Sequence, residues 1–245
     1  MSDYPPRLYE LLHTGNAGDE RFYEDLCAGA KSVLELGCGG GRISSRLVRL
    51  GLSVTGIDSN PLMIEAARER IDPAGAFAGV VADMRSFDLS RAFDRIIAPY
   101  NGILCLLSDA DAAACFERVE RHLADGGIFA FDIYLAGDDP EPCLEEEHLV
   151  SVEDRGEVFH VFERDISGGV LRRFDVEYVY RKEVDGGFEE KRFEIPQRSY
   201  DLPQLRVLLE ANGLEITKVF PDFEEGEIDD GTTRIAVVVS RKIAG

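Results

Sequence analysis

The sequence predicts an α/β fold, a doubly wound, seven-stranded and mainly parallel sheet that carries an antiparallel β insertion. From residue 31 to about residue 140, short apolar segments alternate with segments of helical period, which is typical of βαβ units covered by helices on both faces. Between residues 145 and 200, apolar and polar residues alternate instead, as they do in antiparallel strands. Helix and strand then resume and return the chain to the core.

These patterns divide the chain into three parts. Residues 1–30 form an N-terminal helical segment, residues 31–140 and 200–245 form the core, and residues 141–199 form the insertion. In the first part, Leu8, Leu11 and Leu12, and later Phe22, Tyr23 and Leu26, recur at helical spacing. We therefore expect two short helices there, joined by a loop.

The elements of the core follow from apolar runs, caps and glycines. A helix that begins near residue 42 has its apolar residues at i, i+4 and i+7. Asn60 and Pro61 suit the N-cap and first position of a helix, and Ser108 with Asp111 resembles a capping box. We expect strands at residues 33–36, 52–57, 80–81, 93–98 and 128–133, and helices at 42–50, at 61–70 and from 108 to a turn at Asp125-Gly126-Gly127.

The insertion is expected to hold strands at residues 148–153, 157–166, 170–184 and 188–195, with glycine turns between the later ones. On the strand at 170–184, the alternation would place Phe174, Val176, Tyr178 and Tyr180 on an apolar face and Arg173, Asp175, Glu177 and Arg181 in solvent. A helix at 202–211 and strands at 214–220 and 233–241 close the core. Because no helix joins the last two strands, they should pair antiparallel.

Composition excludes several classes of protein. The formal net charge is −20, from 27 Lys and Arg against 47 Asp and Glu, and such a field repels phosphate backbones and anionic membranes. We expect no nucleic acid and no membrane as partner, and no apolar run approaches the roughly 20 residues of a membrane span. Residues 1–7 do not have the pattern of a signal peptide, so a cytoplasmic protein is expected. Five scattered cysteines and four histidines show no metal-ligand spacing, which favours a site without metal.

The first chemical signal is a glycine loop that follows a strand. Gly37, Cys38 and Gly39 come directly after that strand, and Asp58 ends the next strand 19 residues beyond Gly39. An acidic side chain there can accept hydrogen bonds from both hydroxyls of a ribose. Nicotinamide-dependent oxidoreductases share these features, but their fingerprint needs a small residue where this chain has Arg42. We expect the long Arg42 side chain to stand between helix and strand and to exclude a dinucleotide.

Further motifs favour another family. The chain resembles the class I S-adenosylmethionine-dependent methyltransferases, whose first motif, E/D-x-G-x-G-x-G, is matched by Glu35, Gly37, Gly39 and Gly41. Segments similar to that family's later motifs follow in order at residues 56–63, 82–84, 93–94 and 123–129. The resemblance covers about residues 30–135 and implies the strand order 3-2-1-4-5-7-6 with the last strand antiparallel.

The resemblance also implies where S-adenosylmethionine would bind. Gly37, Cys38 and Gly39 would lie along its methionine and ribose portion, and Asp58, followed by Ser59, would hold the ribose. Glu35 would reach the amino group through water, or would instead cap the amides of the glycine loop. The remaining residues implied in cofactor binding lie at the adenine and at the end of the fourth strand: Met63, which could also be plain core, Asp83, Met84 and Pro99.

The acceptor is less well defined by the sequence. Amino-methyltransferases of nucleic acids and of glutamine carry N/D-P-P-Y/F after the fourth strand, whereas this chain has Ala98-Pro99-Tyr100-Asn101. The layout resembles small-molecule methyltransferases in which strands inserted after the fifth strand form a lid, as in sugar amine N-methyltransferases. The implied reaction is methyl transfer to a nitrogen or oxygen of a small molecule. A non-catalytic S-adenosylmethionine-binding regulatory protein is the alternative.

Residues near the carboxyl ends of the strands are candidates for contact with the acceptor, because ligands of open α/β sheets bind there. We single out Tyr100, Tyr134 and His13 as catalytic candidates, and Asp132 and His160 as further ones. Positioning can suffice for this reaction, since a sulfonium already activates the methyl group. The insertion should form one wall of the acceptor pocket, although its apolar face would also suit a homodimer.

Overall fold

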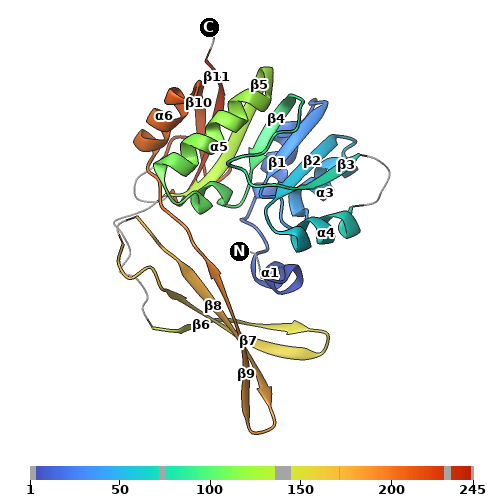
Figure 1. Ribbon diagram of the computed structural model, residues 1–245, viewed down its shortest axis with the longest axis vertical. Coiled ribbons are helices and arrows are strands. Elements are labelled where there is room, and N and C mark those ends of the chain that lie inside the picture. Colours follow the sequence, from blue (N-terminus) through green and yellow to red (C-terminus); the bar gives the residue numbers. More distant parts are fainter. Residues whose placement is uncertain (1–3, 72–75, 136–144, 171, 229–232, 244–245) are drawn as a thin grey trace.

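A computed structural model describes residues 4–71, 76–135, 145–170, 172–228 and 233–243 (Figure 1). Its central sheet has seven strands in the order β10-β11-β5-β4-β1-β2-β3. In this sheet β11 runs opposite to the other six strands, which are parallel to one another. This confirms the predicted fold and strand order. The strands are β1 (Ser32–Leu36), β2 (Ser53–Asp58), β3 (Phe77–Val81), β4 (Phe93–Ala98), β5 (Leu123–Tyr134), β10 (Leu214–Pro221) and β11 (Ile235–Lys242).

Helices cover both faces of this sheet. One face packs against α5 (Asp109–His122) and α6 (Leu202–Ala211), and the other against α2 (Asp19–Cys27) and α3 (Arg42–Arg49). The helix α4 (Pro61–Arg70) lies beside β2 and β3 (Figure 1). The predicted caps are present, since Asn60 Oδ1 accepts from the amide of Leu62 at 2.9 Å and Ser108 Oγ accepts from that of Asp111 at 3.1 Å. Burial of the apolar faces drives this packing.

The structure differs from the sequence-based elements at three places in the core. The predicted turn at Asp125-Gly126-Gly127 lies within the bounds of β5, where the pairing partners of β4 jump from Leu123 to Ile128, so these residues interrupt the regular pairing of the two strands. Strand β3 begins at Phe77, earlier than expected. A short 3-10 helix, η1 (Gly102–Cys105), follows the turn after β4 and was not predicted.

The insertion forms a second, antiparallel sheet of four strands in the order β6-β7-β8-β9, which we call the lid sheet. Its strands are β6 (Glu147–Asp154), β7 (Glu157–Asp165), β8 (Val176–Val184) and β9 (Gly187–Ile195). The strand expected at 170–184 starts only at Val176, because Gly168, Gly169 and Arg172 have positive φ angles and turn the chain before it. Figure 1 shows the lid sheet below the central sheet, with α1 (Pro6–Leu12) between them.

The two faces of β8 are not divided as the alternation predicted. Tyr180 is fully buried, as expected, but so is Val179, which points to the other face. Glu177, predicted to face solvent, is 7% exposed and pairs with Arg164 and Arg192 at 2.8 Å each. A layer of ion pairs therefore covers the face of the lid sheet that was expected to be open to water.

The helix α1 and the residues before it pack on the lid sheet as well as beside α4. Tyr4 and Leu8 pack with Phe159, Val161 and Tyr180. The hydroxyls of Tyr4 and Tyr180 lie 2.7 Å apart, and that of Tyr180 also donates to the carbonyl of Leu8 at 2.9 Å. This segment and the lid sheet thus form one apolar cluster.

No helix in the described ranges is both long and apolar enough to cross a bilayer. Four cysteines of the described chain are free thiols, while Cys143 lies outside the described residues. Those same residues contain no group of three metal-binding side chains.

Candidate active site

A cavity of about 750 Å³ lies between the central sheet, α1 and the lid sheet. Its walls include residues from the ends of β1, β2 and β4, as expected for a ligand site of an open α/β sheet. Asp132 and His160 do not line it, but all residues expected to bind the cofactor do, as do three of the five catalytic candidates: His13, Glu35, Gly37, Cys38, Gly39, Asp58, Ser59, Met63, Asp83, Met84, Pro99, Tyr100 and Tyr134. The fold thus brings residues from distant segments into one hollow.

The glycine loop forms the floor of the cavity at the end of β1. Gly39 has a φ of +52°, and a Cβ there would meet no atom within 4 Å, so its surface stays open to a ligand. Gly41 has a φ of +79°, and a Cβ there would come within 3.1 Å of Ala67. The first of these glycines exposes backbone to the cavity, and the second allows α3 and α4 to approach closely.

Asp58 holds the loop and keeps acceptor capacity. Its two carboxylate oxygens accept from the amides of Gly39 at 3.0 Å and of Asn60 at 2.8 Å. Burial raises the pKa of this carboxyl, and these two hydrogen bonds oppose the rise. A carboxylate has about four acceptor positions, so two remain for hydroxyl groups of a ligand.

Glu35 lies beneath the loop and is 3% exposed. It accepts a hydrogen bond from Ser44 in the first turn of α3. Among the described residues, Ser44 is the group that hydrogen-bonds the Glu35 side chain. No hydrogen bond from a glycine-loop amide to Glu35 is seen there, so the structure does not support the alternative that Glu35 caps these amides. Burial raises the pKa of Glu35 to about 7, although Ser44 and Arg42 favour the charged form.

The raised pKa of Glu35 predicts two opposite pH dependences. Below pH 7 the carboxyl is largely protonated, and a ligand ammonium must displace that proton. We expect the affinity for S-adenosylmethionine to rise between pH 5.5 and 7, whereas the contribution of Glu35 to unfolding stability falls over the same range. Calorimetry in two buffers of different ionisation enthalpy measures the released proton. A Glu35→Gln variant with the same pH slope as the wild type would contradict this role.

The expected adenine end of the cavity is built around Asp83. Arg85 donates from Nε and Nη2 to its carboxylate at 3.0 and 2.6 Å, and this partner lowers the pKa of Asp83. Arg85 also pairs with Asp111 at 2.8 Å, which fixes it to α5. Met63 is buried at the cavity wall, and the methyl group of Met84 reaches over Gly37. Arg85 was not among the residues predicted from the sequence. Its position directly after Met84 and two residues after Asp83 could have indicated a partner for that carboxylate.

The turn after β4 has an unusual backbone. Tyr100 and Asn101 have φ angles of 57° and 61°, a left-handed conformation that costs about 1 to 2 kcal/mol for each such residue. Their amides donate to the two oxygens of Asp132 at 2.9 and 3.0 Å, and the hydroxyl of Tyr23 donates to the same carboxylate at 2.6 Å. Asp132, expected to face the acceptor, is fully buried behind this turn. It positions Tyr100 instead of contacting a ligand.

Two other sequence-based interpretations need correction. His160 lies on the lid sheet outside the cavity, where its Nδ1 is 2.8 Å from Ser151 Oγ. The guanidinium of Arg42 does not stand between helix and strand. It makes two hydrogen bonds with Asp19, at 2.9 and 2.6 Å, and lies 5.7 Å from the ring of Tyr100. The side chain of Arg42 extends toward Asp19 and lines one side of the cavity.

Four rings from three separate segments meet at the other end of the cavity, and we call them the aromatic cage: Tyr9, His13, Tyr100 and Tyr178. The ring centre of His13 lies 4.1 Å from that of Tyr9, 5.1 Å from that of Tyr178 and 6.1 Å from that of Tyr100. Burial lowers the pKa of His13 to about 4, so its ring is neutral at physiological pH. Its Nε2 is buried and has no hydrogen-bond partner among the described residues.

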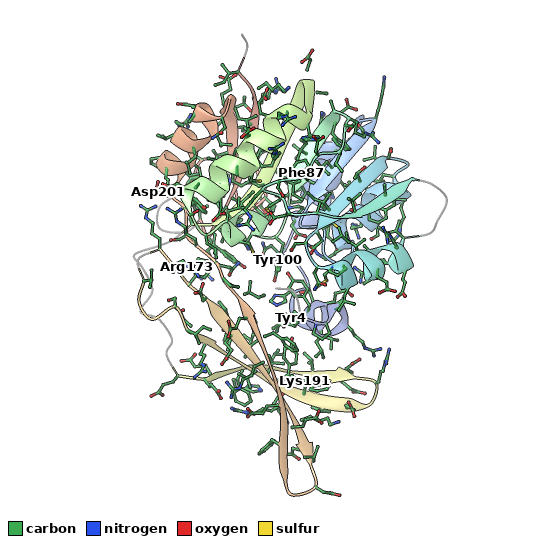
Figure 2. All side chains as sticks on the ribbon, viewed as in Figure 1. Tyr4, Phe87, Tyr100, Arg173, Lys191 and Asp201 are labelled. Atoms are coloured by element: carbon green, nitrogen blue, oxygen red, sulfur yellow. The ribbon has the colours of Figure 1, made fainter. Side chains whose placement is uncertain are left out.

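The lid sheet contributes to the walls at this end. Tyr178 comes from β8, and Ile195, Pro196 and Gln197 follow the end of β9 along the cavity. Figure 2 shows Tyr100 in the space between the central sheet and the segment that carries Tyr4. Tyr134 lines the cavity near its mouth, where its side chain is partly exposed and its hydroxyl is 3.3 Å from Asn16 Oδ1.

Comparison with known proteins identifies the chemistry of this site. Residues 33–127 match the family model described as a methyltransferase domain. YqeM of Bacillus subtilis (strain 168), which carries a methyltransferase name, is 25% identical over 196 residues, or 80% of this chain and 78% of that protein. The chain is a class I S-adenosylmethionine-dependent methyltransferase. The oxidoreductase interpretation is therefore excluded.

Solved structures of other methyltransferases match the fold of this methyltransferase over nearly the whole chain. The CcbJ methyltransferase from Streptomyces caelestis has a TM-score of 0.79 at 23% identity and covers 99% of this chain and 98% of its own. The sugar N-methyltransferase KedS8 from Streptoalloteichus sp ATCC 53650 has a TM-score of 0.79 at 20% identity, over 99% and 94% of the two chains. At these identities the likeness concerns the fold, including the lid sheet.

The residues around the glycine loop fit S-adenosylmethionine. Asp58 has two acceptor positions left, Gly39 presents open backbone, and Glu35 supplies a buried carboxyl. When bound, this cofactor supplies a methyl carbon activated by a positively charged sulfur. The methyltransferase itself has to hold the acceptor in line with that carbon and keep water away.

Proposed function

We propose that the methyltransferase transfers the methyl group to a nitrogen or oxygen of a small-molecule acceptor, which binds between the aromatic cage and the end of the lid sheet. The observation that carries this proposal is that one cavity is lined both by the glycine loop with Asp58 and by four aromatic rings. Its volume of about 750 Å³ falls in the range of small-molecule sites.

Two further observations favour a small acceptor. The net charge of −20 disfavours nucleic acid. KedS8, which shares the whole fold including the lid sheet, is described as a sugar N-methyltransferase. The lid sheet brings Tyr178 and the segment after β9 over the cavity, which limits the room for a macromolecule.

His13 and Tyr100 are proposed to orient the acceptor. With a pKa near 4, His13 is too weak a base to hold a proton taken from an amine or hydroxyl at neutral pH. Its neutral Nε2 can instead accept a hydrogen bond from the acceptor and direct a lone pair toward the methyl carbon. Tyr134, nearer the mouth, is proposed to contact the remainder of the acceptor.

Binding and turnover together test this function. Calorimetry should show S-adenosylmethionine binding with a micromolar or lower dissociation constant. Incubation with cell extract fractions and with panels of amines and hydroxyl compounds should yield products heavier by one methyl group, detected by mass spectrometry with a deuterated methyl donor. Cofactor binding without any methylated product would favour the regulatory alternative, and absence of cofactor binding would contradict the proposal.

A homodimer remains a prediction, because no interface is present in a structure of one chain. Sedimentation with and without S-adenosylhomocysteine measures it directly. A monomer that turns over would leave the lid sheet free to serve as the cavity wall alone.

A further inference from the structure

Resting on the proposed function, we infer that the aromatic cage is a binding site for an ammonium cation and that the acceptor reacts through an amine nitrogen. The cage combines rings from α1, from the turn after β4 and from β8. Such a ring cluster attracts a cation because the ring faces carry negative potential. A neutral hydroxyl would gain no such attraction.

The geometry suits a small cation better than a flat ring. The plane of His13 is inclined by 83° to that of Tyr178 and by 67° to that of Tyr100. Tyr9 lies at 33° to His13, against its ring at 4.1 Å. The rings therefore contact His13 and present differently inclined surfaces to the cavity, which suits a compact group, whereas a broad planar group needs parallel ring faces.

The charges around the cage also favour a cation. His13 is neutral, and the guanidinium of Arg42 is balanced by its two hydrogen bonds with Asp19. Burial raises the pKa of Tyr9 and of Tyr178, with smaller contributions that include Asp58 for the first and Glu163 for the second. Arg42, the cation 5.7 Å from the ring of Tyr100, is thus neutralised by Asp19 and leaves no unpaired positive charge of its own beside the cage.

Amine methylation creates the charge that such a cage would hold. A neutral amine nitrogen forms the new N–C bond with its lone pair, while the S–C bond breaks and leaves its electrons on sulfur. The positive charge thus passes from sulfur to nitrogen, and the ammonium loses its proton to water after release. Rings that face the nitrogen stabilise the transition state because it already carries part of this charge.

The test compares a cation with its uncharged carbon analogue. Choline and 3,3-dimethylbutan-1-ol have nearly the same shape and differ in the charge on the central atom. With S-adenosylhomocysteine at saturation, we expect choline to bind about tenfold more tightly or better. Its methyl protons should shift upfield in the NMR spectrum on binding, because they lie against ring faces.

Ring variants locate the effect in the cage. Tyr178→Phe keeps the ring and should keep the preference for choline, whereas Tyr178→Leu should reduce it to about threefold or less. Phe188→Leu is the matched control, since this ring lies on the lid sheet with 61% of its surface exposed. It should bind choline like the wild type. Binding of S-adenosylhomocysteine to each variant shows that the fold is intact.

The outcomes separate this inference from the proposed function. Equal binding of the two probes to the wild type would overturn the cation site, even if Tyr178→Leu failed to fold. Products methylated only on oxygen would overturn the amine assignment while the proposed function stood. Failure to bind S-adenosylhomocysteine would instead contradict the proposed function itself.

Discussion

Replacing Asp58 by alanine is expected to weaken S-adenosylmethionine binding by about 2 to 4 kcal/mol. The variant loses a charged acceptor that can serve two hydroxyls, and the hydroxyls would be buried without partners. The amides of Gly39 and Asn60 lose their acceptor as well, which adds local disorder at the loop. Calorimetry measures the affinity directly, and the change corresponds to roughly a 30-fold to 900-fold larger dissociation constant.

A second variant separates charge from loop geometry. Asp58→Asn has nearly the same shape, but its amide nitrogen cannot accept from either backbone amide or from a hydroxyl. We expect a loss close to that of Asp58→Ala. If either variant bound the cofactor like the wild type, with an unchanged circular dichroism spectrum, the role of Asp58 would be wrong.

Replacing Asp132 by alanine should lower the free energy of unfolding by about 3 to 5 kcal/mol. The change leaves two backbone amides and the hydroxyl of Tyr23 buried without an acceptor. The left-handed pair Tyr100 and Asn101 would then relax and move the Tyr100 ring. Urea denaturation followed by circular dichroism measures the loss.

The tyrosine that shares this carboxylate provides the control. Tyr23→Phe removes one hydrogen-bond donor but leaves both amide hydrogen bonds to Asp132, so a loss of only about 1 kcal/mol in the free energy of unfolding is expected.

Burial raises the pKa of Asp132 to about 6, from an ordinary value of 3.8. The part of its contribution to stability that depends on protonation is therefore complete below pH 4 and lost as the pH rises through 6, whereas the three hydrogen bonds it accepts persist. A wild-type stability profile that matched Asp132→Asn across this range would contradict the assignment.

The position of the glycine-loop residues in one cavity was predictable because these residues are contiguous in motifs. Glu35 to Gly41 span the end of one strand and the turn after it, and Asp58 ends the next strand. The order of strands and turns in the sequence therefore places these residues close together. The same holds for the strand order, which follows from the connections between neighbouring units. Local patterns carry such information because parallel strands end at a common edge.

The acceptor side was less predictable because it joins segments that are distant in sequence. Tyr9 was not singled out, although it lies four residues before His13 and therefore on the same face of the N-terminal segment. Tyr178 was expected on an apolar face but not beside Tyr100. Only the folded chain shows that α1, the turn after β4 and β8 meet.

Charge and backbone conformation account for the remaining errors. Glu177 was assigned to solvent because period-2 alternation treats charged residues as exposed. It is buried instead, and two arginines compensate its charge. Asp132 was assigned to the acceptor because it ends a strand. The sequence did not reveal that Tyr100 and Asn101 turn their amides back toward it.

The attachment of α1 to the lid sheet has a consequence for biosynthesis. Tyr4 and Leu8 precede the core in the sequence, but their partners Phe159 and Tyr180 are made more than 150 residues later. At typical elongation rates of about 5 to 20 residues per second, the apolar side of α1 waits roughly 8 to 35 seconds for its cover. The nascent chain therefore exposes the apolar side of α1 throughout translation of the core, until the lid sheet that covers it has been made.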